Sequence, residues 1–235
     1  MQPINDFMDQ QTQTIWDIPV RICHWAIVLL VIAQWVTAEL LDDAIQWHAW
    51  FGYGLLGVVV FRLLWGFIGS RYARFGQFLA SPKTVLHYLV ATFKGEAPTY
   101  TGHNPLGGWM ALFLLLVLLV QSITGLFMTD EIFFSAPYFS AVSSDVQSLM
   151  NTLHHQAFTV IQIAVLLHVI AALIYVFVKK QPIIKAMVTG KKPTPESGIS
   201  HDYWLKLIVS IIVICVLLYL TVVVWPPEQE ALWMY

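Results

Sequence analysis

Five apolar runs, each long enough to cross a lipid bilayer, constrain this chain more than any other feature of its sequence. They are expected at about 24–41, 48–68, 108–128, 150–180 and 204–225. A helix needs about 20 apolar residues to span a hydrocarbon core about 30 Å thick. The chain of 235 residues is 58% hydrophobic and 11% charged, whereas soluble domains carry about 25% charged residues. We therefore expect an all-α integral membrane protein with five spans.

Charge is divided between the loops, and this division predicts the orientation. All twelve Lys and Arg residues are expected on one side: Arg21, Arg62, Arg71, Arg74, Lys83, Lys94, Lys179, Lys180, Lys185, Lys191, Lys192 and Lys206. The loops of the other side carry only acidic residues: Glu39, Asp42, Asp43, Asp130, Glu131, Asp145, Glu228 and Glu230. Cytoplasmic loops are enriched in Lys and Arg. We therefore expect a cytoplasmic N-terminus and an outer C-terminus.

Other features bear on processing and on the cofactor. The first fifteen residues are polar and lack the basic start and apolar core of a signal peptide, so we expect the mature chain to begin as written. The two cysteines, Cys23 and Cys215, are far apart and lie in or beside apolar runs, which predicts no disulfide framework. The chain also lacks the CxxCH motif through which haem is attached covalently.

Two connecting segments have a recognisable character. Residues 81–94 (SPKTVLHYLVATFK) are expected to form a short amphipathic helix at the membrane surface. Its inward side chains are expected to be Leu86, Leu89, Val90 and Phe93. The segment 193–198 (PTPESG) is expected to be a polar linker before the last span.

The fourth run carries three histidines, and helical geometry separates them. His154 and His168 are fourteen residues apart. This spacing returns to within roughly 40° of the same helix face and moves about 21 Å along the axis, whereas His155 falls on a different face. An ionisable residue at membrane depth is costly to leave unpaired, so His154 and His168 are candidates for a functional site. A histidine that is hydrogen-bonded to a neighbouring helix is the alternative.

Two further histidines open other runs, and depth sorts the four into pairs. His24 opens the first span at the cytoplasmic side, and His48 opens the second span at the outer side. The fourth span runs inward, which places His154 at the outer side and His168 toward the cytoplasm. The expected pairs are therefore His48 with His154 and His24 with His168.

Paired imidazoles at two depths of a helical bundle are typical of two non-covalent haems b, each held by two axial histidines. Zinc would need a third or fourth protein ligand at one level. Carboxylate metal sites need Asp or Glu, which these spans almost lack. We therefore predict an inner haem on His24 and His168 and an outer haem on His48 and His154.

Three other features of the spans have more than one interpretation. Arg62 lies fourteen residues after His48 and shares its helix face. It either pairs with a propionate of the inner haem or extends to lipid phosphate. Gly125 and the glycines that follow His48 either leave room for a ring or are ordinary packing positions. Gln121 is expected to form an interhelical hydrogen bond rather than to act as a ligand.

His103 and Asn104 lie at the cytoplasmic boundary, just before the third span. A quinone head group needs a hydrogen-bond donor or proton partner near a haem edge, and histidine exchanges protons near neutral pH. These two residues are therefore candidates for a quinone site, with a helix-start turn built on Asn-Pro as the alternative. His87 and His201 are expected to be solvated.

Several motifs taken together resemble one known family. They are VRICHW, FRLLWGFIGSRYARF, GHNPLGGWM, ITGLF, the spacing of the two histidines in the fourth run, and AMVTGKK. These pieces, spread over 16–192, resemble the b-type cytochrome subunit of nickel-iron hydrogenases and the wider bacterial cytochrome b561 group. The resemblance implies two haems b in a four-helix bundle and electron transfer between quinone and a periplasmic partner. The ligand positions of the family match His24, His48, His154 and His168, and the fifth span is a departure from a minimal member.

From these features we expect a dihaem cytochrome b in the bacterial inner membrane. Residues 1–192 are expected to form the haem domain, and residues 193–235 the linker and the extra span. The expected partners are lipid, quinone and a periplasmic hydrogenase, another dehydrogenase or a c-type cytochrome, with no nucleic acid. A stand-alone enzyme such as a superoxide:quinone oxidoreductase is the alternative, weakened by the lack of outer cations. A metal or proton transporter ranks third, because its spans should contain carboxylates or midplane Gly/Pro breaks.

Overall fold

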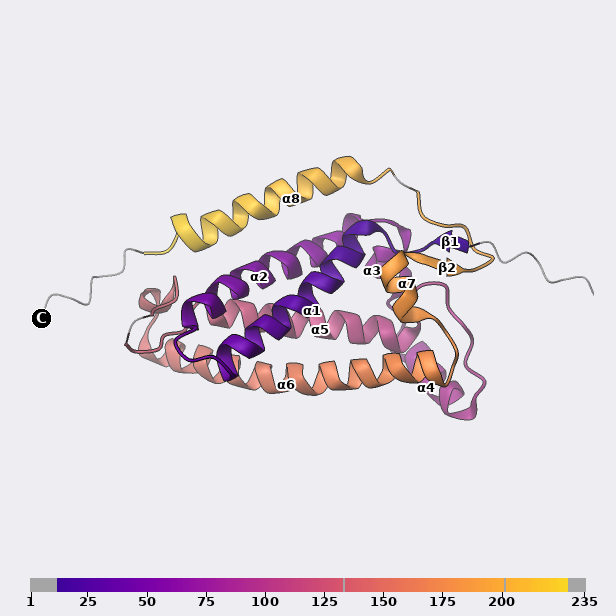
Figure 1. The fold of residues 1–235 in the computed structure, drawn as a ribbon, viewed down its shortest axis with the longest axis horizontal. Coiled ribbons are helices and arrows are strands. Elements are labelled where there is room, and N and C mark those ends of the chain that lie inside the picture. Colours follow the sequence, from indigo (N-terminus) through magenta and orange to yellow (C-terminus); the bar gives the residue numbers. More distant parts are fainter. Residues whose placement is uncertain (1–11, 133, 201, 228–235) are drawn as a thin grey trace, which may run out of the picture. The chain divides into compact units, whose positions relative to one another are not determined.

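The computed structural model describes residues 12–132, 134–200 and 202–227. Within these residues, five helices are long and apolar enough to cross a membrane. They are α1 (Ile18–Glu39), α2 (Ile45–Ile68), α5 (Pro105–Gly125), α6 (Ser144–Phe177) and α8 (Trp204–Tyr219), the last continued by the π-helical turn η3 (Leu220–Val224) (Figure 1). The predicted all-α membrane fold with five spans is confirmed.

Four of these helices, α1, α2, α5 and α6, begin before the apolar runs that predicted them. Asp17 caps α1, because its Oδ1 accepts a hydrogen bond of 2.7 Å from the backbone N–H three residues on. Asn104 caps α5 in the same way, also at 2.7 Å. The helix α6 begins at Ser144 with an acidic residue in its first turn, which the helix dipole favours. Hydrophobicity thus marks the membrane-embedded part, whereas the polar caps set the helix ends.

The chain divides into two compact units, which we call the basic unit and the acidic unit. The basic unit comprises Met1–Ile22, Leu64–Phe113 and Val165–Leu207. The acidic unit comprises Cys23–Leu63, Leu114–Ala164 and Ile208–Tyr235. Every Lys and Arg of the chain except Arg62 falls in the basic unit. Each of the five long helices contributes one part to each unit.

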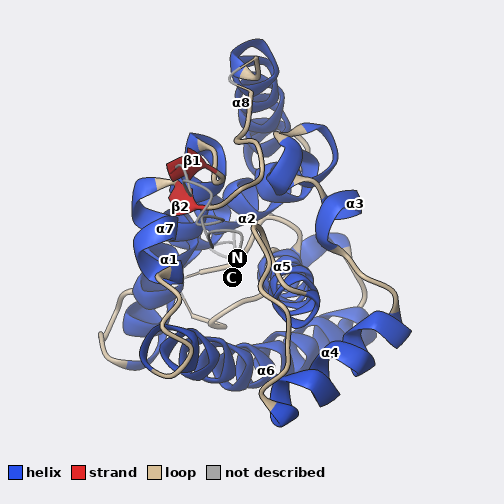
Figure 2. Ribbon diagram, turned by 90° about the vertical axis from the view of Figure 1, so that its right-hand side faces the viewer, coloured by secondary structure: helices blue, strands red, loops and turns tan. Residues whose placement is uncertain are grey.

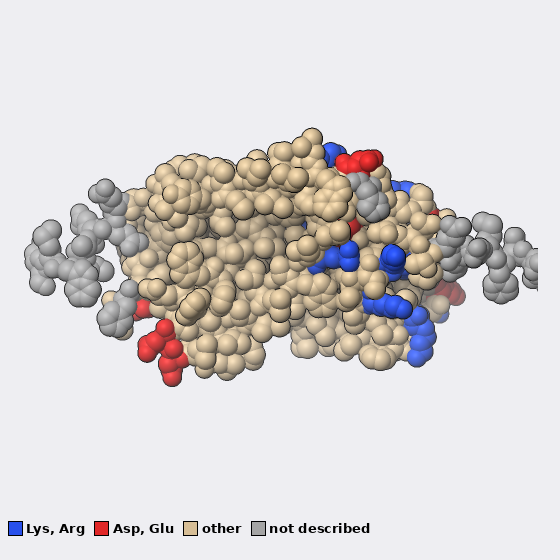
Figure 3. All heavy atoms as spheres, turned by 45° about the horizontal axis from the view of Figure 1, so that its top comes forward, with Lys and Arg blue, Asp and Glu red and all other residues tan. Residues whose placement is uncertain are grey.

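Much of the surface is apolar, as expected for helices that face lipid. On the face drawn in Figure 3, a broad area of the described residues carries no Lys, Arg, Asp or Glu. Large apolar side chains are exposed along the spans, among them Leu29 at 66%, Leu166 at 59% and Val216 at 50%. Because a membrane removes such surface from water, this exposure agrees with five spans in a bilayer.

The fifth long helix is attached to the acidic unit at two points. A Cβ on Gly57 of α2 would lie 3.1 Å from a methyl group of Leu218 on α8. The hydroxyl group of Tyr138, beside the short helix η2 (Phe139–Ala141), donates a 2.8 Å hydrogen bond to the carbonyl oxygen of Thr221. Ile214 is also buried. The extra span is therefore packed on α2 within this unit.

In the basic unit, a two-stranded antiparallel sheet joins the N-terminal segment to the residues after α7 (Ile183–Thr189). The strands β1 (Thr12–Thr14) and β2 (Lys191–Pro193) pair with Gln13 opposite Lys192 (Figure 2). Gly190, with a φ of 79°, ends α7 and accepts hydrogen bonds from Ile15 and Trp16 at 2.8 and 3.1 Å. A side chain at this position would be strained, so glycine is required here.

The long loop before α5 contains η1 (Arg71–Ala73), α3 (Phe75–Phe78) and α4 (Pro82–Lys94), which confirms the short helix predicted over 81–94. Tyr88 of α4 is buried, and its hydroxyl group lies 2.8 Å from that of Tyr175. Burial and this hydrogen bond raise the pKa of Tyr88. Leu86 and Phe93 are 62% and 84% exposed, so the apolar face predicted to contact the membrane is not covered by protein.

The segment 193–198, predicted to be a polar linker, is packed against the loop before α5. Thr194 is 4% exposed, and its hydroxyl group lies 2.9 Å from that of Thr101. Glu196 accepts hydrogen bonds from Thr101 at 2.9 Å and from Tyr72 at 3.0 Å. The Lys192 ammonium group donates to the carbonyl oxygens of residues 100 and 101, and burial lowers its pKa. Four of its six residues are exposed, so this polar segment is both solvated and hydrogen-bonded to the loop.

Candidate functional site

Two of the four predicted ligands lie together in the acidic unit. The ring of His48 on α2 and the ring of His154 on α6 have centroids 6.5 Å apart and planes inclined by 71°. Both residues are half-buried, whereas His155 is exposed. Of the adjacent His154 and His155, the half-buried one is therefore the one that helical phase selects.

Both rings are held through Nδ1 by a neighbouring helix. Nδ1 of His48 lies 3.2 Å from the carbonyl oxygen of Gln34 and 3.3 Å from Oγ1 of Thr37, both on α1. Nδ1 of His154 lies 3.1 Å from Oγ1 of Thr124 on α5. Sequence reasoning missed both threonines, because an isolated Thr in an apolar run has no signal that separates it from ordinary packing.

Two further residues of α5 surround the His154 ring. Gln121 forms the predicted interhelical hydrogen bond, with its amide nitrogen 3.0 Å from Nε2 of His154. Gly125 faces the same ring so closely that a Cβ would lie 3.2 Å from Cε1. The glycine therefore provides the space into which the imidazole fits.

The donor set of this pair fits a metal centre whose other ligands come from a cofactor. A metal–imidazole bond is about 2 Å long, so two such bonds in line place the nitrogens about 4 Å apart and each ring centroid a ring radius further. The 6.5 Å between the centroids of His48 and His154 agrees with that arrangement. Among the described residues, no group of three or more His, Cys, Asp or Glu side chains is arranged to hold a metal ion alone. A porphyrin supplies the four ligands that a two-histidine site lacks.

The other two predicted ligands belong to different units. His24 on α1 is half-buried in the acidic unit, and His168 on α6 is half-buried in the basic unit. Their pairing joins residues of different units and stays a prediction.

Arg62 is buried within α2, at 6% exposure. It is the only Lys or Arg that the sequence places in the acidic unit. A guanidinium group that extends to lipid phosphate keeps its charged end exposed, so the burial of this side chain favours an internal partner.

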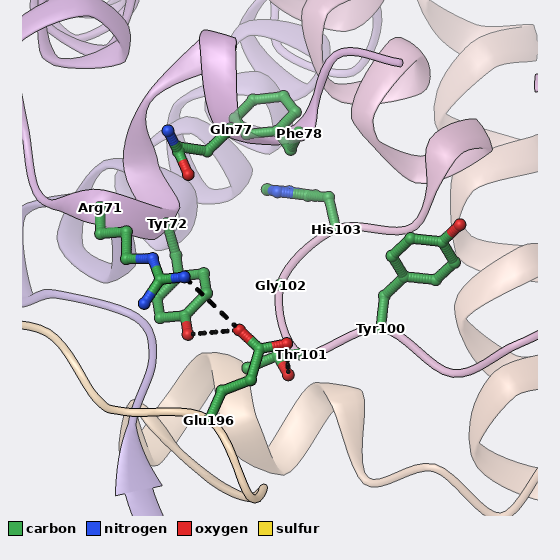
Figure 4. A pocket seen from close by; sticks show the side chains of 9 residues that line it. All are labelled: Arg71, Tyr72, Gln77, Phe78, Tyr100, Thr101, Gly102, His103 and Glu196. Carbon is green, nitrogen blue, oxygen red and sulfur yellow. Dashed lines mark hydrogen bonds and ion pairs between the residues drawn. The ribbon is translucent and has the colours of Figure 1, made fainter. Parts of the chain in front are cut away.

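His103 lies in the basic unit between two aromatic rings. Its centroid is 4.7 Å from Trp16 and 4.5 Å from Phe78. It borders a cavity of about 140 Å³ whose other lining residues are Arg71, Tyr72, Gln77, Phe78, Tyr100, Thr101, Gly102 and Glu196 (Figure 4). The structure thus places a titratable ring beside a polar cavity near the start of α5.

Charged and polar groups occupy the other side of this cavity. The Arg71 guanidinium group lies 3.8 Å from the Glu196 carboxylate, and the Tyr72 hydroxyl group donates to the same carboxylate (Figure 4). Burial and the hydrogen bond to Glu196 raise the pKa of Tyr72, so its hydroxyl group keeps its proton at neutral pH. The sequence analysis assigned none of these three residues to a functional site. It placed Glu196 in a segment expected to be a linker.

Asn104 has a structural role at this site. Its Oδ1 caps α5, and its Nδ2 donates a 2.9 Å hydrogen bond to the hydroxyl group of Tyr175. The helix-start turn that Asn-Pro suggested is therefore present. His87 on α4 is exposed, as predicted, and His201 lies outside the described residues.

The fold defines the class of this protein as a multi-pass helical membrane protein. A family model described as prokaryotic cytochrome b561 matches residues 15–190. The chain belongs to this family, which confirms the resemblance drawn from the sequence motifs. It is a membrane cytochrome b that takes part in electron transfer, and its family implies haem b as the cofactor.

Curated relatives agree with this assignment. A probable Ni/Fe-hydrogenase B-type cytochrome subunit of Bradyrhizobium diazoefficiens is 28% identical over 219 residues, which cover 77% of this chain and 86% of the relative. Proteins with the same description from Rhizobium leguminosarum and Rhodobacter capsulatus are each 27% identical over 218 residues. These alignments cover 79% and 76% of this chain, and 90% and 80% of the relatives.

Proposed function

We propose that this protein is a dihaem cytochrome b that transfers electrons between a periplasmic redox partner and the quinone pool. The observation that carries the proposal is the facing pair of His48 and His154 inside a member of the cytochrome b561 family. Haem b supplies a one-electron redox centre when bound. The chain contributes the axial imidazoles, excludes water from their surroundings and fixes the rings on rigid helices.

Four histidines are proposed as axial ligands. His48 and His154 hold the outer haem, and His24 and His168 hold the inner haem. Their location on the first, second and fourth spans leaves the third span to support the rings, as Thr124 does at Nδ1 of His154. We propose residues 1–192 as the haem domain and residues 193–235 as the attached fifth-span segment.

Arg62 is proposed as the partner of a propionate of the inner haem. A buried cation within a span needs an anionic or hydrogen-bonding partner, because leaving a charge unpaired in an apolar medium is costly. Its side chain is 6% exposed, which supports a partner inside the protein over one in the lipid head groups.

The orientation follows from the division of charge. Loops rich in Lys and Arg stay in the cytoplasm, so the basic unit is proposed to face the cytoplasm and the acidic loops the periplasm. The N-terminus is then cytoplasmic and the C-terminus periplasmic, in a bacterial inner membrane. A hydrogenase is proposed as the periplasmic partner because the curated relatives carry that description, ahead of another dehydrogenase or a c-type cytochrome. A superoxide:quinone oxidoreductase is disfavoured, because an anionic substrate would be attracted by exposed cations, and Arg62, the one Lys or Arg of the acidic unit, is buried.

The haem content of the purified protein tests the proposed function. We expect a dithionite-reduced spectrum of b type and two haems per chain in a pyridine haemochromogen assay, because two histidine pairs can each hold one ring. The control is the same protein expressed without haem supply, which should lack the signal. One haem per chain, or none, would contradict the dihaem assignment.

His103, beside the cavity, is proposed as the hydrogen-bonding partner of a quinone head group. Asn104 supports it by fixing the start of α5. Replacing His103 with Phe keeps an aromatic ring between Trp16 and Phe78 but removes both nitrogens, and we expect quinone-analogue binding to weaken about tenfold, as for the loss of one hydrogen bond. Equilibrium titration of a labelled analogue measures the effect.

His87 offers a matched control for this titration, because it is an exposed histidine on α4. The variant His87→Phe should bind the analogue as the unchanged protein does. Unaltered affinity in His103→Phe would show that the quinone binds elsewhere.

A further inference from the structure

We propose that Thr37 and Thr124 are positioning residues that fix the tautomers of His48 and His154, so that each ring offers Nε2 to the outer haem. The inference rests on the proposed function, because it assigns a role at a haem-binding pair. It goes beyond that function because it names two hydroxyl groups, on α1 and α5, that set the redox properties of one centre.

The arrangement at His154 determines the ring proton. Oγ1 of Thr124 lies 2.9 Å from the carbonyl oxygen of Val120 and 3.0 Å from that of Gln121. Carbonyl oxygens only accept hydrogen bonds, so the single hydroxyl proton of Thr124 is donated to the backbone. The lone pairs of Oγ1 then face Nδ1 of His154, 3.1 Å away, which must carry the proton. Nε2 keeps its lone pair, which accepts a hydrogen bond from the amide group of Gln121 at 3.0 Å. A bound iron would take the place of that amide group.

The same arrangement recurs at His48. Oγ1 of Thr37 donates to the carbonyl oxygen of Ala33 at 2.7 Å, which again leaves its lone pairs for the imidazole. Nδ1 of His48 lies 3.3 Å from this oxygen and 3.2 Å from the carbonyl oxygen of Gln34. A carbonyl oxygen beside Nδ1 requires that Nδ1 carry the proton, so Nε2 is again free to bind a metal.

This hydrogen bond affects the metal as well as the geometry of the ring. An imidazole that donates its second N–H to an acceptor is a more basic ligand, and such partners tune the redox potential of the bound metal. A more basic ligand stabilises the oxidised iron, so removing the acceptor should raise the midpoint potential. The effect should be larger at Thr124, whose Oγ1 lies 3.1 Å from Nδ1 of His154, than at Thr37, whose Oγ1 lies 3.3 Å from Nδ1 of His48. At His48 the carbonyl oxygen of Gln34 remains.

The test is a redox titration of the purified dihaem protein, followed by absorbance, with Thr replaced by the isosteric Val. Thr124→Val is expected to shift one of two one-electron waves upward by about a tenfold change in the equilibrium constant, or about 59 mV. Thr37→Val should shift the same wave by less. Thr124→Ser, which keeps the hydroxyl group, should restore the original potential. Thr159→Val is the matched control, because Thr159 makes the same backbone hydrogen bond on α6 but is exposed.

Each outcome decides the inference. An unshifted wave in Thr124→Val, an equal shift in Thr159→Val, or a failure of Thr124→Ser to restore the potential would overturn it. Loss of one haem in Thr124→Val that Thr124→Ser reverses would support it. If Thr124→Val retains neither haem, Thr37→Val decides, since two unshifted waves there would contradict the role. An unchanged protein with fewer than two haems would refute the proposed function instead, and is therefore a separate result.

Discussion

Replacing His154 with alanine is expected to leave one haem per chain instead of two. The outer haem would lose one of its two histidine ligands. The adjacent His155 cannot take its place, because it is exposed and falls on a different face of α6. The inner haem should stay, because its proposed ligands, His24 and His168, are unchanged. A pyridine haemochromogen assay should read half the unchanged value, and a redox titration should show one one-electron wave.

The adjacent histidine provides a matched control. His155 lies on the same helix one residue further on, but its side chain is exposed. His155→Ala should therefore keep both haems and both waves. Two haems in His154→Ala, or the loss of one in His155→Ala, would contradict the ligand assignment.

The proposed inner pair gives the complementary result. His168→Ala should remove the wave that His154→Ala retains, and His48→Ala should remove the same wave as His154→Ala. Two variants that removed the same haem, one from each proposed pair, would show that the depth argument had sorted the histidines incorrectly. This comparison is needed because the pairing of His24 with His168 is still a prediction.

The spans and the helix face of His154 were predictable from the sequence because a bilayer imposes strict rules. Backbone polar groups in lipid must be satisfied within a helix, so a long apolar run has one available structure. A fixed rotation per residue then decides which of two adjacent histidines is inward. Both constraints act within a single helix, so they can be recognised from the periodicity of the sequence.

Contacts between segments far apart in the chain were not predictable in this way. Thr124 meets His154 across two helices, and Thr37 meets His48, at sequence separations that differ between the two pairs. No periodicity connects them, because the geometry is set by how the helices pack. Glu196 is a similar case, since its bonds to Tyr72 and Thr101 depend on the path of the chain after β2. From composition alone, such a segment is predicted to be a solvated linker.

Asp17 connects two helices through one carboxylate, and its replacement should have the largest effect on stability. Its side chain is 1% exposed. Oδ1 accepts from the backbone N–H of Val20 at 2.7 Å, and Oδ2 accepts from the indole N–H of Trp65 at 2.9 Å. One carboxylate thus caps α1 and joins it to the end of α2 within the basic unit.

Asp17→Ala is expected to lower the free energy of unfolding by about 2–4 kcal/mol. Loss of a helix cap costs about 1 kcal/mol, and a buried indole N–H left without an acceptor costs a further 1–3 kcal/mol, roughly. Trp65 is 0% exposed, so water does not replace the lost acceptor. Denaturant titration of the detergent-solubilised protein, followed by circular dichroism, measures the change.

Two variants separate the contributions at Asp17. Asp17→Asn keeps a capping oxygen but presents an N–H group to the indole, so it should lose only the part due to Trp65. Asp145→Ala is the control, because Asp145 is an exposed acidic residue in the first turn of α6 and contributes at most about 1 kcal/mol through the helix dipole. An Asp17→Ala protein as stable as Asp145→Ala would show that the buried carboxylate does not join α1 to α2, because breaking two buried hydrogen bonds cannot cost as little as removing one exposed charge.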